Sequence, residues 1–238
     1  MAITKVTSGV LAADAVGVAS LSATGTADAT TFLRGDNAWA SAAAGFDDIK
    51  VWTSTQSGYL IPAGITKVLF YVTGGGGGGA GASGSAGCSG GASGGTAIKK
   101  LVLVGGTDTI DVTIAATANG GATTADGTIG NDTTVASASG TSFTTITGPG
   151  GKPGRYNNVP IAAATPTGGD ANIPGGSSAD LFGGASYYGQ GGAGGWTATV
   201  ALAGQAPGSG GGGGYPSGAT YYPGAAGAAG IVIAYLFK

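Results

Sequence analysis

Glycine recurs at every third position between residues 75 and 90. The glycines of this series are Gly75, Gly78, Gly81, Gly84, Gly87 and Gly90, and the residues between them are Gly, Ala, Ser and a single Cys. A period of three fits neither an α-helix nor a β-strand, but it is the period of the polyproline II helix. Collagen shares this period, yet its X and Y positions are rich in proline, which this stretch lacks. The series therefore predicts polyproline II structure.

The same spacing returns in four later stretches of the chain. Its members there are Gly148, Gly151 and Gly154; Gly183, Gly189, Gly192 and Gly195, with Ser186 in the gap; Gly208, Gly211 and Gly214; and Gly224, Gly227 and Gly230. A polyproline II helix has no internal hydrogen bonds, so its backbone groups need water or neighbours. A flexible Gly/Ser linker is the alternative for any one tract. Repetition, with apolar segments between the tracts, favours a folded bundle.

The bundle hypothesis makes a steric prediction. A glycine at every third position leaves one edge of each helix without side chains, so that neighbouring helices can approach and bond backbone to backbone. We therefore expect no room for a side chain at Gly84, whereas the intervening Ser83 is expected to face outward.

Composition excludes several classes of protein. The chain has 53 Gly among 238 residues, no Glu and no His, and only 8% charged residues with a net charge of −2. Long-chain helix formers are scarce, and no basic patch indicates nucleic-acid binding. The single Cys88 permits no internal disulfide and is expected to be a small buried residue. No apolar run is long enough for membrane insertion, and no signal segment is recognisable, so synthesis in a cytoplasm is expected.

Strand signals lie between the glycine tracts. Lys67–Thr73 alternates in hydrophobicity, and Ile231–Phe237 is a strong closing strand. Shorter or weaker strands are expected at Ile49–Trp52, Tyr59–Ile61, Ile98–Val104, Thr109–Ile114 and Thr141–Thr147, with a turn at Pro62–Gly64, a hairpin turn at Gly105–Thr107 and irregular structure at Ala115–Ala138 and Arg155–Pro166. The predicted fold class is all-β with a glycine-rich polyproline II helix bundle and essentially no α-helix. We expect β-structure to clamp both ends of the bundle.

The first 45 residues differ from the rest and predict a separate segment. Residues 1–45 are rich in Ala, Thr and Val and poor in Gly, with too few large apolar side chains to form a core in one copy. We expect them to be ordered by sister chains, as in a homotrimer, or by a docking protein. Residues 46–238 then form the glycine-rich domain.

Two segments resemble known proteins. The sequence TTFLRGDNAWA at Thr30–Ala40, preceded by LSATGTAD, resembles a motif near the ends of phage tail-fibre proteins. The sequence IPAGITKVLFYVTGGGGGG at Ile61–Gly79, together with the C-terminal GAAGIVIAYLF, resembles the glycine-rich domain of phage and prophage tail proteins. In some phage adhesins that domain is a sandwich of polyproline II helices with receptor-binding loops at its tip. The resemblance implies a fibre or adhesin of a virion.

No catalytic, metal or cofactor site is expected. Without His the chain cannot build a Ser-His-Asp or Cys-His site, and it lacks the usual zinc ligands. Asp108 and Asp111 are interpreted as turn and strand-end acids rather than a glycosidase pair. An enzyme is therefore the least favoured class.

Aromatic residues beside Gly or Pro are the remaining functional signal. Tyr and Trp offer a stacking face and a polar tip, and next to Asn, Ser and Gly they are typical of adaptable binding surfaces. The candidate binding residues are Tyr156, Asn157, Asn158, Tyr187, Tyr188, Trp196, Tyr215, Tyr221 and Tyr222. The two tyrosine pairs are expected to line one shallow groove. The alternative is that these rings fill gaps between layers of the bundle.

The function expected from these signals is host attachment by a virion tail-fibre or tip protein. Such a protein is made in the cytoplasm of a bacterial host, docks to other tail proteins through its N-terminal segment and binds a glycan or protein receptor. The first alternative is a purely structural virion component, such as a head fibre or decoration protein. The second is an ice-binding polyproline II protein, which would expose a flat Ala/Thr face.

Overall fold

The computed structural model describes residues 24, 31–33, 38–41, 46–82, 88–157, 159, 162–178, 180–196, 199–217 and 220–238. The chain divides into two compact units, Met1–Gly45 and Phe46–Lys238. No α-helix occurs in the described ranges. The all-β prediction is therefore confirmed.

The first unit contains a short ribbon. Strands β1 (Thr31–Leu33) and β2 (Trp39–Ser41) pair antiparallel. The backbone N–H of Trp39 also donates to the carbonyl of Thr24 at 2.7 Å. Phe32 and Leu33 expose 49% and 38% of their surface. A two-stranded ribbon of this kind is marginally stable by itself.

The second unit begins with a five-stranded antiparallel sheet. Its strands, in spatial order, are β10 (Ala171–Ile173), β6 (Thr96–Val102), β5 (Lys67–Thr73), β13 (Ile231–Phe237) and β3 (Asp48–Trp52). β5 and β13 have the bounds that their alternating sequences predict, because every second side chain points to the same face. On the inner face, Val72, Phe70 and Val68 stand beside Val232, Ala234 and Leu236, and all six are buried.

A four-stranded antiparallel sheet covers that inner face. Its strands, in order, are β4 (Gln56–Leu60), β7 (Thr109–Thr113), β8 (Thr133–Ser139) and β9 (Ile146–Gly148). Ile110, Val112, Val135 and Ile146 from this sheet join the buried cluster formed by β5, β6 and β13. The two sheets form a β-sandwich with one apolar core.

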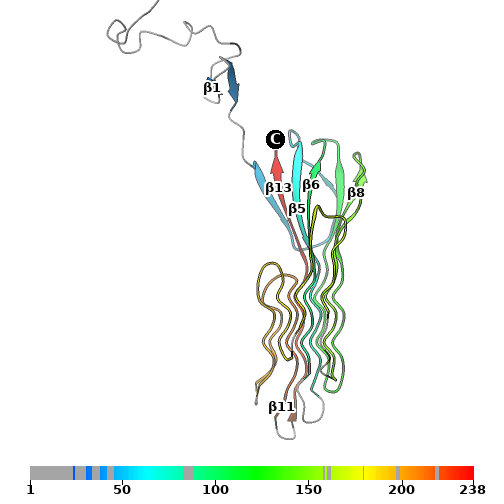
Figure 1. The fold of residues 1–238 in the computed structure, drawn as a ribbon. Helices are drawn as coiled ribbons and strands as arrows, with labels where there is room; N and C mark the ends of the chain where they lie inside the picture. Colours follow the sequence, from blue (N-terminus) through cyan, green and yellow to red (C-terminus); the bar gives the residue numbers. More distant parts are fainter. Residues whose placement is uncertain are drawn as a thin grey trace, which may run out of the picture. The chain divides into compact units, whose positions relative to one another are not determined.

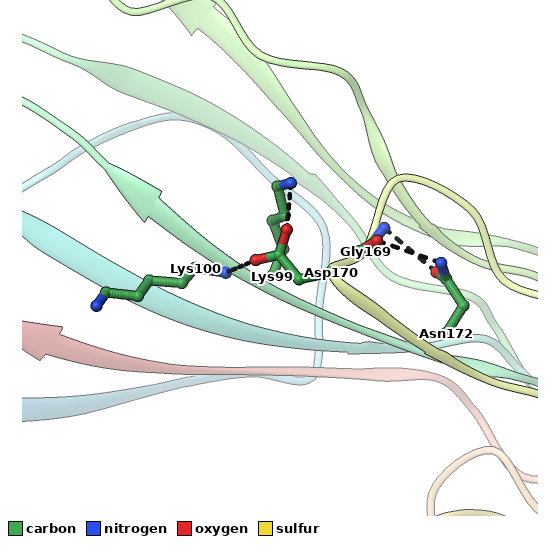
Figure 2. Close-up of polar contacts among 5 residues, drawn as sticks. All are labelled: Lys99, Lys100, Gly169, Asp170 and Asn172. Carbon is green, nitrogen blue, oxygen red and sulfur yellow. Dashed lines mark hydrogen bonds and ion pairs between the residues drawn. The ribbon is translucent and has the colours of Figure 1, made fainter.

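Polar side chains fix the margins of this sandwich. Figure 2 shows Asp170, next to the edge strand β10, accepting bonds from the Lys99 ammonium (2.6 Å) and the Lys100 backbone N–H (3.0 Å). These bonds hold the pKa of Asp170 below its ordinary value, the Lys99 bond being the larger cause. Asn172 and Gly169 close the adjoining turn through two bonds of 3.2 Å. These contacts help to hold β10 against β6.

A long bundle of extended tracts adjoins the sandwich. Figure 1 shows the sheets at one end of the second unit and the tracts running from them to β11 (Pro216–Ser217) at the other. β11 pairs with β12 (Thr220–Tyr221) and nothing larger. The expectation that β-structure clamps both ends was therefore wrong, since both large sheets lie at one end.

Hydrogen bonds in the tract 74–82 follow a strict period of three. The N–H groups of residues 74, 77 and 80 donate to the carbonyls of 95, 92 and 89. Those of 75, 78 and 81 donate to 131, 128 and 125, and those of 76, 79 and 82 donate to 228, 225 and 222, all nine bonds being 2.9–3.1 Å. Three successive residues thus point to three different neighbours, which is the geometry of polyproline II. The tract forms no hydrogen bonds within itself.

The carbonyls of the same tract point to three further segments. Gly75 and Gly78 accept from Gly151 and Gly154, Gly77 and Ala80 accept from Gly211 and Gly214, and Gly79 and Ala82 accept from Gly121 and Thr124. Six segments of the chain therefore surround tract 74–82. Tract 88–95 repeats the pattern, because residues 88, 91 and 94 donate to 214, 211 and 208 while 89, 92 and 95 donate to 155, 152 and 149.

Glycine is required where these tracts approach one another. A Cβ added to Gly78 would lie 1.9 Å from the Asn119 carbonyl oxygen, and one added to Gly210 would lie 1.8 Å from that of Gly91. The residues with side chains inside the central tracts are small, and Cys88 is fully buried as predicted. Its thiol donates to the Tyr156 carbonyl at 3.1 Å.

The steric pattern differs from the prediction of one closed edge. Gly76 and Gly77 lie between the period-three positions, yet their added Cβ atoms would meet carbonyl oxygens at 1.9 and 2.1 Å. Gly75, a member of the series, is the roomiest position of 74–79, with the nearest atom at 3.0 Å. A helix with neighbours on all sides has no free edge. The predicted contrast between Ser83 and Gly84 lies outside the described residues.

Three further predictions of local structure were wrong. Gly105–Thr107 forms a turn, but it joins β6 of one sheet to β7 of the other and is not a hairpin. The stretch 115–138 contains hydrogen-bonded bundle tracts and the start of β8. The series from Gly183 to Gly195 is interrupted by a turn in which Ser186 and Gly189 exchange backbone bonds, so it belongs to two tracts.

Candidate functional site

The end of the bundle away from the sandwich gathers six of the predicted binding residues. We call it the distal end and define it by residues 122–126, 155–157, 196, 215–217 and 220–222. The tract 74–82 leads to it from β5, and its last residue, Ala82, bonds to the carbonyl of Tyr222 at 2.9 Å. At about 3.1 Å per residue, that tract places the distal end roughly 28 Å from Thr73.

Trp196 and Tyr215 form a stacked pair at this end. Their ring centroids lie 5.4 Å apart with planes inclined by 16°, and Trp196 is 60% exposed. The Trp196 backbone N–H donates to the Thr199 hydroxyl at 2.9 Å. The preceding Gly195 donates to the Gly213 carbonyl. The stack is therefore held by bundle backbone while one aromatic face remains open to solvent.

Tyr221 and Tyr222 are neighbours in the chain but differ in exposure. Tyr221 lies in β12 opposite Pro216 and is 42% exposed. Tyr222 is half-buried, and its carbonyl is the acceptor for Ala82. Tyr221 therefore presents its ring to solvent, whereas the Tyr222 backbone joins the β11–β12 pair to the bundle.

A hollow of about 500 Å³ lies at the part of the distal end that carries Tyr156. It is lined by Asp126, Lys152, Arg155, Tyr156, Asn157, Val159 and Ala162. The Asp126 carboxylate binds the Arg155 guanidinium at 2.6 Å and accepts the Tyr156 backbone N–H at 2.9 Å. Asp126 thus fixes both the basic group and the backbone that carries the exposed Tyr156 ring.

Tyr156 and Asn157 were predicted from the sequence as binding residues, but the charged residues of this hollow were not. Arg155 directly precedes Tyr156, and Lys152 lies between Gly151 and Gly154 of a bundle tract. Their positions in the sequence could therefore have identified both as neighbours of the predicted Tyr156. Asp126 comes from the turn between two other tracts, and nothing in the sequence indicated that it lies beside Arg155. Asn158 lies outside the described residues.

Tyr187 and Tyr188 lie elsewhere, against the outer face of the five-stranded sheet. The Tyr187 ring is 6.0 Å from that of Tyr71 and 5.2 Å from that of Tyr188. Tyr188 is half-buried, and burial raises its pKa to about 12. The structure does not bring the two tyrosine pairs into one groove, because the length of the bundle separates them.

The distal end therefore combines fixed backbone, open aromatic faces and a polar hollow. Aromatic faces bind flat apolar surfaces, and the amide and charged groups bind hydroxyl and acidic groups. Within the described ranges, no three His, Cys, Asp or Glu side chains meet as a metal ion would need. In the same ranges, no helix has the length and apolar character that crossing a membrane requires.

Comparison with known proteins adds a family. Among curated proteins, none matches this chain. A family model described as the glycine-rich domain matches residues 53–236, which include the sandwich from β4 onward and the whole described bundle. The chain therefore belongs to the glycine-rich domain family.

Proposed function

We propose that the protein is a tail-fibre or tip protein of a bacteriophage virion, which attaches the particle to a glycan or protein receptor on its host. The observation that carries this proposal is the distal end, where Trp196, Tyr221 and Tyr156 expose 60%, 42% and 48% of their surface. The backbone beneath them is fixed by the bundle. A rigid rod that ends in open aromatic rings suits adhesion, because little conformational entropy is lost on binding.

The sequence resemblance at Thr30–Ala40 and Ile61–Gly79 supports the same proposal. In this account residues 1–45 assemble with sister chains and dock to other tail proteins, and the distal end points to the host. The protein is synthesised in the bacterial cytoplasm and acts in the virion. No catalytic step is included.

Adsorption of the purified protein to host cells tests the proposal. We expect Trp196→Ala and Tyr221→Ala each to weaken binding several-fold, since an aromatic contact contributes about 1 kcal/mol. The double variant should bind far less than either single variant. Melting temperatures should stay close to the wild type, because both rings are largely exposed.

Val104→Ala is the control at an exposed apolar residue. Val104 is 56% exposed but lies between β6 and β7 of the sandwich, at the other end of the bundle, so its loss should leave adsorption unchanged. If the double variant binds as well as the wild type, the attachment proposal fails at this site and the purely structural virion role is favoured. Early melting of the variants would instead identify the two rings as packing groups.

A further inference from the structure

The five-stranded sheet has a second face, which the sandwich does not cover. Register places Val51, Ile233, Tyr71 and Ile98 in one row across four strands, and Ile49, Tyr235, Leu69 and Lys100 in the next. We call these two rows the outer sheet face. Seven of its eight side chains are apolar or aromatic, whereas Lys100 and the neighbouring Lys67 stand at its margin.

This outer sheet face is open. Ile49 and Val51 are 43% and 48% exposed, and Tyr71, Ile233 and Tyr235 are half-buried beside one another and Tyr187. These three residues, with Tyr187 and Tyr188, surround a hollow of about 120 Å³, the size of one side chain. A contiguous apolar patch with a polar margin is typical of a protein–protein interface.

We propose that copies of this chain associate through the outer sheet face. Phe46, the first residue of the second unit, packs its ring on Tyr235 with centroids 5.5 Å apart. The 45-residue segment that precedes it therefore joins the domain at the border of this face. That segment contains too little apolar material for a core of its own, and its β1–β2 ribbon leaves Phe32 and Leu33 exposed. Sister chains that assemble through this segment are therefore tethered to one another at the border of the outer sheet face.

The association uses the face of the sheet rather than its free edge. Edge strand β3 carries Asp48 and Lys50 on the inner side, beside Leu236 and Ala234 of β13. The Lys50 ammonium lies 5.9 Å from the Trp52 ring centroid. Inward-pointing charges on an edge strand oppose pairing with another strand. The outer side of β3, with Ile49 and Val51, has no such protection.

Sedimentation velocity of the full 238-residue chain tests this proposal, which does not depend on host attachment. We expect a concentration-dependent trimer for the wild type and at least about a tenfold weaker association for Val51→Lys, because a buried unpaired ammonium opposes the interface. Ile129→Lys makes the same change at a residue that is 60% exposed on the bundle, so it should assemble as the wild type does. A monomeric wild type, or equal assembly of both variants and the wild type, overturns the proposal.

A labelling experiment reads the outer sheet face directly. In Val51→Cys, the new thiol should react with a maleimide at least about tenfold more slowly at high than at low protein concentration. The Ile129→Cys thiol should react equally fast at both, and Cys88 is buried in each variant. Equal reactivity of the Val51→Cys thiol at both concentrations would show that sister copies do not cover the outer sheet face.

Discussion

The sandwich and the bundle are stable for opposite reasons. In the sandwich, large side chains such as Phe70 and Ile110 fill a common core, and backbone bonds run within each sheet. In the bundle, the central tracts contain few and small side chains, and successive backbone N–H groups of tract 74–82 bond in turn to three different neighbouring tracts. A sandwich is damaged mainly by removing atoms, which leaves cavities. A bundle of this kind is damaged mainly by adding them.

The largest expected effect comes from adding one carbon to the bundle. Gly78→Ala would put a Cβ 1.9 Å from the Asn119 carbonyl oxygen, and backbone cannot move aside as a flexible side chain can. We expect a loss of more than about 4 kcal/mol in the free energy of unfolding, measured by urea denaturation. Gly75→Ala, in the same tract, meets its nearest atom at 3.0 Å and should cost about 1–3 kcal/mol. Equal costs would mean that the tract is not enclosed as described.

The next effect comes from removing carbons from the sandwich. Val112→Ala deletes two methyl groups from a residue that is 1% exposed, which should cost about 2–3 kcal/mol. Val104→Ala makes the same change where the side chain is 56% exposed, and its cost should stay below about 0.5 kcal/mol. Chemical denaturation of both variants measures the difference. A costly Val104→Ala would place part of the core outside the two sheets.

A smaller effect is expected at a carboxylate that ties two turns of the sandwich together. Asp108 accepts backbone N–H bonds from Val104 (2.8 Å) and Thr141 (3.0 Å), and the Val104 bond is the first cause that lowers its pKa. Its contribution to stability is therefore complete above the unfolded pKa of about 3.9 and is lost as the pH falls through the lower folded value. Asp108→Asn should cost about 1–3 kcal/mol at neutral pH.

Thermal melts between neutral and acidic pH measure this contribution. The stability gap between wild type and Asp108→Asn should narrow as the pH falls through the folded pKa. A gap that stays constant over this range would contradict the assignment of the stabilisation to the ionised carboxylate.

The smallest effect is expected at the surface pair that anchors β10. Asp170→Asn removes the charge that meets Lys99, but the two side chains are 56% and 29% exposed, so water and salt screen the interaction. We expect a smaller change in melting temperature than for Asp108→Asn, and that change should disappear in high salt. A salt-independent loss would indicate that the hydrogen bond to the Lys100 backbone matters more than the charge.

The sequence was most informative where a regular period decided the structure. Alternation fixed β5 and β13 to the residue, and a spacing of three identified the bundle. β8 was not predicted, because TTVASAS has one large apolar residue, Val135, and the other side chains that alternate along the strand are small. The prediction of a hairpin at Gly105–Thr107 was wrong, because turn residues in a sequence do not show whether the next strand pairs with the previous one or enters another sheet. The prediction that the two tyrosine pairs line one groove was wrong. The path of each tract through the bundle decides at which end a turn lies, and the sequence does not show that path.

Amide hydrogen exchange measured residue by residue tests the central claim most directly. If tract 74–82 is a helix bonded on all sides to neighbouring tracts, the amides of Gly76, Gly77, Gly78 and Gly79 exchange as slowly as those of Phe70 and Val72 in β5, through global unfolding. Exchange of these four amides at the rate of an unstructured peptide, while β5 stays protected, would contradict the account and identify the glycine tract as a solvated linker.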